Sequence, residues 1–175
     1  MRSSRTNIMT NSRKPFRINV GFIMHEEVGF QTEIPFDLEK VKIEDLELRG
    51  FLGSVTIGRT PQGLVMQGKF SAETKLECVR CLREFWHALT WEITELYAFQ
   101  KKNVSESGLM VPDDAHLELA PLLREYALLE VPINPIHDPE CKGLCIECGQ
   151  DLNVKDCGHS QETDDSPFAS LKNLL

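Results

Sequence analysis

Two pairs of cysteines, each separated by two residues, are the part of the sequence best suited to chemistry. The first pair is Cys78 and Cys81, and the second is Cys145 and Cys148. A two-residue spacer allows both sulfurs of one tight turn to reach a single tetrahedral ion at about 2.3 Å. In a compartment that keeps thiols reduced, such pairs bind metal more often than they form disulfides. The spacing therefore predicts structural zinc.

The remaining ligands for closed zinc sites lie near these pairs. A structural zinc takes four ligands, and the six cysteines together with two neighbouring histidines are enough for two sites. Pairing ligands that are near one another along the chain predicts how they divide. The first set comprises Cys78, Cys81, His137 and Cys141, and the second comprises Cys145, Cys148, Cys157 and His159.

Two other groupings of the same residues stay open, each with one zinc ion instead of two. A single all-cysteine site would use Cys141, Cys145, Cys148 and Cys157, and a zinc ribbon would use Cys78, Cys81, Cys145 and Cys148. A redox dithiol at the first pair is disfavoured, because no helix start and no βαβ pattern follows it.

No motif in the sequence indicates catalysis. A zinc ion with four protein ligands has no open position for water or substrate, so its role is structural. The sequence contains no HExxH metalloprotease motif, no nucleophile elbow and no glycine-rich phosphate loop. We therefore expect a non-enzymatic protein that takes no small-molecule substrate.

The first cysteine pair interrupts a long stretch of predicted β-structure. Side chains of one parity, such as Val28, Phe30 and Ile34, alternate with more polar ones over much of residues 18–104. Strands joined by short turns indicate an antiparallel sheet. Leucines at helical spacing predict one helix at about 119–130, packed on that sheet. The expected fold is α+β, with an antiparallel β-rich body (a small barrel or sandwich), one packed helix and a C-terminal zinc-knuckle module.

Three segments are expected along the chain. Residues 1–17 are predicted to be a disordered basic tail, residues 18–132 the β-rich body, and residues 133–175 the zinc-knuckle segment with a short C-terminal helix from Ser166. The first segment is rich in arginine and serine and contains no acid, so a plastid transit peptide is an alternative interpretation.

Charge and hydropathy limit the partners and the compartment. The 175 residues carry a formal net charge of -8, which argues against coating nucleic acid with a uniformly basic face. The charge is uneven, because residues 1–17 hold five basic and no acidic side chains. Local RNA contacts would fall to the candidates Arg80, Arg83, Lys101 and Lys102. No apolar run is long enough for a membrane helix and no secretion signal is evident, so a cytoplasmic location is expected.

Three strings of the sequence resemble the YceD family, named as large ribosomal RNA subunit accumulation proteins. They are Leu76-Glu77-Cys78-Val79-Arg80-Cys81-Leu82, Leu122-Leu123-Arg124-Glu125, and Cys141-Lys142-Gly143-Leu144-Cys145 continuing to Asp151-Leu152-Asn153. The resemblance implies a role in large-subunit ribosomal RNA accumulation and ribosome biogenesis, with ribosomal RNA or a basic ribosomal protein as partner, and it implies no enzymatic activity. The alternative is a zinc-stabilised protein-interaction or transcription-associated module without a ribosomal role.

Overall fold

The structure of the protein is a computed structural model that describes residues 15–159. Most of the basic tail and the C-terminal helix expected from Ser166 lie outside the described residues. The chain divides into two compact units. The first comprises the chain up to Lys75 together with Trp86–Pro132, and the second comprises Leu76–Phe85 together with the chain from Ile133 onward.

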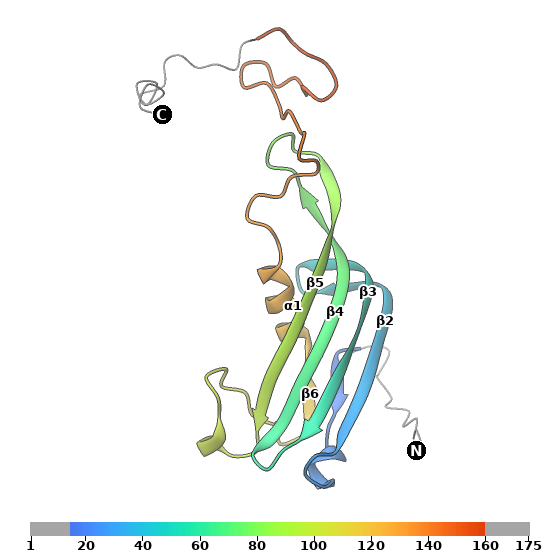
Figure 1. Cartoon of the computed structure of the whole chain (residues 1–175), viewed down its shortest axis with the longest axis vertical. Helices are drawn as coiled ribbons and strands as arrows, with labels where there is room; N and C mark the ends of the chain where they lie inside the picture. Colours follow the sequence, from blue (N-terminus) through green and yellow to red (C-terminus); the bar gives the residue numbers. More distant parts are fainter. Residues whose placement is uncertain (1–14, 160–175) are drawn as a thin grey trace. The chain divides into compact units, whose positions relative to one another are not determined.

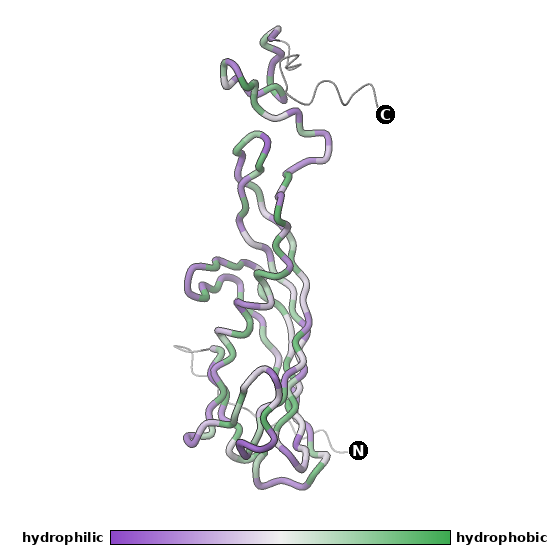
Figure 2. Tube along the Cα trace, turned by 90° about the vertical axis from the view of Figure 1, so that its left-hand side faces the viewer, coloured by the Kyte–Doolittle hydropathy of each residue, from purple (hydrophilic) through white to green (hydrophobic). Residues whose placement is uncertain are grey.

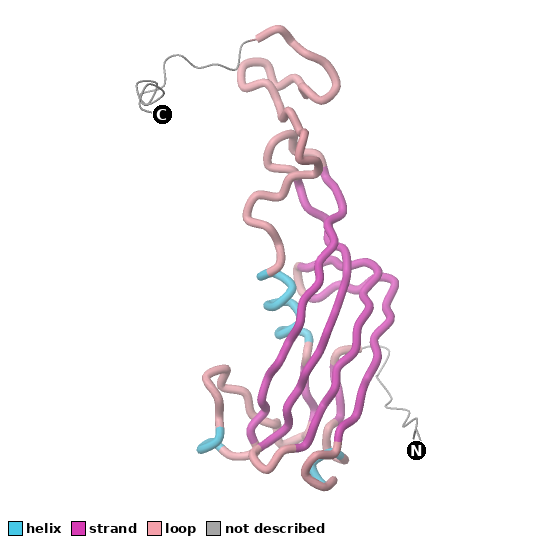
Figure 3. Tube along the Cα trace, in the orientation of Figure 1, coloured by secondary structure: helices cyan, strands magenta, loops and turns pink. Residues whose placement is uncertain are grey.

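The elements of the chain are mostly long β-strands (Figures 1 and 3). They are β1 (Arg17–Asn19), β2 (Gln31–Ile43), β3 (Leu46–Arg59), β4 (Gly63–Glu77), β5 (Glu84–Ala98), β6 (His116–Glu118), the helix α1 (Ala120–Leu129) and the short 3-10 turns η1 (Ile23–His25) and η2 (Lys101–Asn103). Strands β2-β3-β4-β5 form one sheet in that order, and β1 pairs with β6 in a second. The expected antiparallel, β-rich fold class with one helix is confirmed, because β2–β3, β3–β4 and β1–β6 all pair antiparallel.

The core of the first unit lies on one face of the four-stranded sheet. Along β2, Ile34 and Phe36 are buried while Glu33 and Asp37 are exposed, as the period of two predicts. Buried residues of β1, β6 and α1 join the same apolar cluster, so these elements cover that face. The edge-on view in Figure 2 shows them on one side of the sheet. Because two sheets share one core, the body is closer to the expected sandwich than to a barrel.

One contact fixes α1 to the turn between β2 and β3. Arg124 donates from Nε to Asp45 Oδ1 at 2.5 Å and from an Nη atom to Asp45 Oδ2 at 3.0 Å. This two-point contact lowers the pKa of Asp45 chiefly through the hydrogen bond from Arg124.

Among the described residues, no helix is long and apolar enough to cross a membrane.

Aromatic side chains fill the centre of this core. Phe51 on β3 is 0% exposed, and its ring centroid lies 5.3 Å from that of Phe16, 5.5 Å from that of Phe70 and 6.0 Å from that of Trp91. The next residue, Leu52, points to the other face and is 48% exposed. These two neighbours therefore make a matched pair for testing the core.

We expect Phe51→Ala to lower the free energy of unfolding of the first unit by about 3–5 kcal/mol, because it leaves a cavity among packed rings. Leu52→Ala should cost less than about 1 kcal/mol, since its side chain is already half in solvent. Urea titration followed by tryptophan fluorescence measures both. Equal losses for the two variants would contradict the position of the core.

Candidate metal centres

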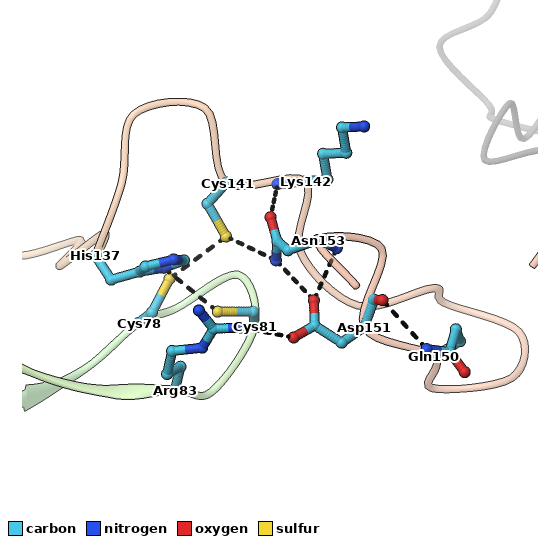
Figure 4. Close-up of polar contacts among 9 residues, drawn as sticks. All are labelled: Cys78, Cys81, Arg83, His137, Cys141, Lys142, Gln150, Asp151 and Asn153. Carbon is cyan, nitrogen blue, oxygen red and sulfur yellow. Dashed lines mark hydrogen bonds and ion pairs between the residues drawn. The ribbon is translucent and has the colours of Figure 1, made fainter. Parts of the chain in front are cut away.

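The first set of predicted ligands converges on one point in the second unit. Cys78 and Cys81 lie in the connection between β4 and β5, and His137 and Cys141 lie in the segment after α1. The four ligand atoms all lie within 4.8 Å of one another. Cys78 Sγ is 3.9 Å from Cys141 Sγ, and Cys81 Sγ is 3.5 Å from His137 Nδ1 (Figure 4).

These separations match the edges of a zinc tetrahedron. Two sulfurs at 2.3 Å from one ion lie about 3.8 Å apart at the tetrahedral angle, and a sulfur and an imidazole nitrogen lie about 3.6 Å apart. The observed 3.9 Å and 3.5 Å are close to both values. A disulfide would need about 2.05 Å between sulfurs. The donor set therefore fits a four-coordinate zinc ion, with His137 presenting Nδ1.

The second set converges in the same way. Cys145, Cys148, Cys157 and His159 also have ligand atoms within 4.8 Å of one another. Cys145 Sγ lies 3.7 Å from His159 Nδ1, again near the sulfur–nitrogen edge of the tetrahedron. The other ring nitrogen of His159 is 3.9 Å from Glu147 Oε2. This separation is longer than a hydrogen bond, so Glu147 lies near the ring without a direct hydrogen bond to it.

A thirteen-residue hairpin, residues 141–153, carries ligands of both sets. It is closed by a bridge between Leu144 and Asp151 and by a hydrogen bond from Cys145 N to Gln150 O at 2.8 Å. Gly149 has a φ of 72° and donates its N–H to Cys145 O at 2.9 Å. A left-handed glycine at this position lets the chain turn straight after the second cysteine pair. The hairpin thus places Cys141 for one set and Cys145 for the other.

The hairpin is joined by hydrogen bonds to the loop of the first cysteine pair. Leu144 N donates to Arg80 O at 3.0 Å, and an Arg80 Nη atom donates to Cys141 O at 2.9 Å. Gly143, with a φ of 78°, lies so close that a Cβ there would be 3.0 Å from Arg80 O. The close approach and the positive φ both require glycine. Backbone contacts and the Arg80 side chain thus bring the two cysteine loops together.

Asn153 forms the outer layer of the first set. Its Nδ2 donates to Cys141 Sγ at 3.5 Å and to Asp151 Oδ1 at 2.7 Å, while its Oδ1 accepts from Lys142 N at 2.8 Å (Figure 4). Asp151 Oδ2 in turn accepts from Arg83 at 3.1 Å. Hydrogen bonds from neighbouring groups fix the orientation of a metal ligand. This network therefore orients Cys141 beside the other ligands of the first set.

Local hydrogen bonds lower the pKa of one cysteine in each set. Burial of Cys78 acts to raise its pKa, but hydrogen bonds with the side chain and backbone of His137 outweigh it and lower the pKa to about 5. Backbone hydrogen bonds from Cys148 and Glu147 lower the pKa of Cys145 to about 6. Thiolate is the form that binds metal, so each set has a sulfur suited to a cation at neutral pH.

The predicted metal ligands and the predicted RNA-contact residues have different surroundings in the structure. The eight Cys and His candidates gather in the two sets that pairing along the chain predicts, not in an all-cysteine or ribbon grouping. Arg80 and Arg83, proposed for RNA contact, are engaged within the second unit by Cys141 O and Asp151. Lys101 and Lys102 lie on η2 in the first unit.

The sequence alone does not identify the residues that hydrogen-bond to the candidate metal ligands. Asn153 and Asp151 lie within a family string, but no pattern in the sequence assigns either of them a contact with a ligand. Asp151 accepts from Asn153 N at 2.9 Å in an Asx turn, and an Asp-x-Asn pattern is a recognisable signal for such turns. The turn is thus visible in the sequence, whereas the contact with a sulfur twelve residues away is not.

We expect elemental analysis to find two zinc ions per chain, with Cys78→Ser and Cys148→Ser each losing one, because each variant breaks a different set. His25→Gln, which changes a histidine of the first unit, should keep both ions. One ion that is unaffected by Cys78→Ser would contradict the division into two sets.

We expect Asn153→Ala to weaken zinc at the first set by about 10- to 100-fold, because the Cys141 thiolate loses its hydrogen-bond donor. Competition with a chromophoric chelator resolves the affinities of the two sets. Asn103→Ala, on η2 in the first unit, is the control and should leave both affinities unchanged. An unchanged first set in Asn153→Ala would show that this contact does not matter.

Comparison with known proteins identifies relatives of the chain. The model of a family described as large ribosomal RNA subunit accumulation protein YceD matches residues 66–175. An uncharacterized protein of Mycobacterium tuberculosis is 29% identical over 163 residues, which cover 88% of this chain and 74% of that protein. An Arabidopsis thaliana protein named large ribosomal RNA subunit accumulation protein YCED homolog 1, chloroplastic, is 33% identical over 63 residues, or 36% of this chain and 20% of that protein. No solved structure gives a significant match. The resemblance seen in the cysteine motifs is thus confirmed, and the chain belongs to the YceD family.

Proposed function

We propose that this protein is a non-enzymatic factor that supports the accumulation of large-subunit ribosomal RNA and the biogenesis of the large ribosomal subunit. The observation that carries the proposal is the match of residues 66–175 to a family whose description names large ribosomal RNA subunit accumulation. The matched region includes both Cys/His sets and the hairpin that connects them. The proposed function therefore concerns the same part of the chain as the candidate metal centres.

Both sets are proposed to hold structural zinc. Each offers four Cys or His ligands, which fill a tetrahedron and leave no coordination position for a reacting molecule. The apolar cluster of the second unit is small, with Cys78, Cys81 and Cys141 packed against Phe85, Ile136 and Leu144. A unit with so little apolar burial needs another source of stability, which zinc supplies when it binds.

The charge of the chain supports a macromolecular partner. Residues 105–175 hold four basic and 14 acidic side chains, an excess of negative charge that suits a basic ribosomal protein. Contact with ribosomal RNA itself would need local basic groups instead. None of the six cysteines is in a disulfide, which supports a reducing compartment such as the cytoplasm.

We expect depletion of the protein to lower the ratio of large-subunit to small-subunit ribosomal RNA, measured by quantitative electrophoresis of total RNA. Expression of the wild-type chain should restore the ratio. The double variant Cys78→Ser, Cys148→Ser should not restore it, because both zinc sets are broken, whereas His25→Gln should. A normal ratio after depletion would refute the ribosomal role and favour the alternative of a zinc-stabilised interaction module.

A further inference from the structure

The first unit has a basic surface that none of the predicted RNA-contact residues belongs to. At one end of the four-stranded sheet, a hollow of about 440 Å³ is lined by side chains from all four strands. Five of them define what we call the basic–tryptophan patch: Lys40 and Lys42 on β2, Arg49 on β3, Lys75 on β4 and Trp86 on β5. We propose that this patch binds an unpaired segment of RNA. The proposal rests on the proposed function and adds to it the surface that would contact the RNA.

Trp86 is the aromatic platform of the patch. Its side chain is 40% exposed, and the guanidinium carbon of Arg49 lies 3.8 Å from the centre of its ring. Arg49 is itself held by an ion pair with Glu73, whose carboxylate oxygen is 2.5 Å from Arg49 Nε. The cation therefore fixes the indole in place before any ligand arrives. A ring that is both exposed and held is suited to stacking against a base.

The lysines supply positive charge beside this platform. Lys40 lies opposite Arg49 in the β2–β3 register. Lys42 lies two residues further along β2, so the two lysines are about 6.6 Å apart along the same strand. Lys42 pairs with Glu47 at 3.6 Å, but both side chains are more than 60% exposed. An ion pair so open to water contributes little, so phosphate can replace the carboxylate at small cost.

RNA fits this surface better than a protein does. The hollow is lined by four of the 19 basic residues of the chain and by one acidic residue, Glu47, so its lining has a net positive charge that is complementary to phosphate. Its exposed indole matches the flat face of a base, and stacking of this kind tolerates any base. In an RNA duplex the base faces are covered by their neighbours, so an unpaired strand is the form that can use Trp86.

Intrinsic fluorescence allows the patch to be observed directly. The chain has two tryptophans, and the other one, Trp91, is 2% exposed and stacks on Phe70 at 5.7 Å. We expect titration of the full chain with a single-stranded 12-nucleotide RNA to quench Trp86. With three or four phosphates contacted, raising salt from 50 to 200 mM should weaken binding by about 20- to 50-fold.

Variants separate the contributions of charge and stacking. With an end-labelled RNA read by anisotropy, Lys40→Ala, Lys42→Ala should reduce the slope of log affinity against log salt by about 1.4, the share of two phosphate contacts. Lys69→Ala is the matched control. Lys69, on β4, is an exposed lysine like Lys40 and Lys42, but it pairs with Glu92 outside the patch. Trp86→Ala should weaken binding by about 10-fold and Trp86→Phe by much less. The fluorescence of Trp91 reports that each variant remains folded.

Three results would overturn the proposal. They are equal binding of duplex RNA without dependence on Trp86, an unchanged salt slope in the double lysine variant, and quenching of Trp86 by an acidic peptide but not by RNA. These outcomes are distinct from failure of the proposed function. If depletion lowers large-subunit RNA but the patch variants bind and complement like the wild type, the patch fails alone. If depletion leaves the RNA unchanged while the patch binds RNA in vitro, the ribosomal role fails alone.

Discussion

The second unit depends on holding two groups of four ligand atoms at tetrahedral separations. Its described part after Pro132 forms no helix or strand of its own, apart from a single β-bridge between Leu144 and Asp151 (Figure 3). Hydrogen bonds between the hairpin and the Cys78–Cys81 loop bring the sulfurs to the edge length of a zinc tetrahedron. The backbone fixes where the ligands are, and a cation at each centre would in turn offset the repulsion among their thiolates.

The first unit achieves its stability by a different route. Its strands bury aromatic and aliphatic side chains on one face of a sheet, with Phe51 in contact with several rings. This leaves the opposite face free to carry charge, including Lys40, Lys42 and Arg49. The first unit is thus organised by apolar burial and the second by the geometry of its polar ligands. Each kind of stabilisation leaves a different kind of surface.

The parts of the molecule that depend on neighbouring residues could be predicted from the sequence. Alternation revealed the strands, helical spacing of leucines revealed α1, and the two-residue spacers revealed the cysteine loops. Spacing alone left three groupings of the ligands open, because the distances between loops depend on the path of the chain. The patch around Trp86 could not be predicted at all, since its members come from four strands and meet only through their pairing and register.

The hairpin of residues 141–153 has a consequence for the order in which metal would be taken up. The second set spans a short piece of chain, with Cys145 and His159 separated by 14 residues, whereas Cys81 and His137 of the first set are separated by 56. In an unfolded chain, closing the longer loop costs about 1.2 kcal/mol more in entropy. We therefore expect the local set to fill first when the complete unfolded chain folds. Once the second set has bound its ion, the hairpin would already hold Cys141 in place for the first set. The ion that binds earlier would thus help the chain to fold around the later one.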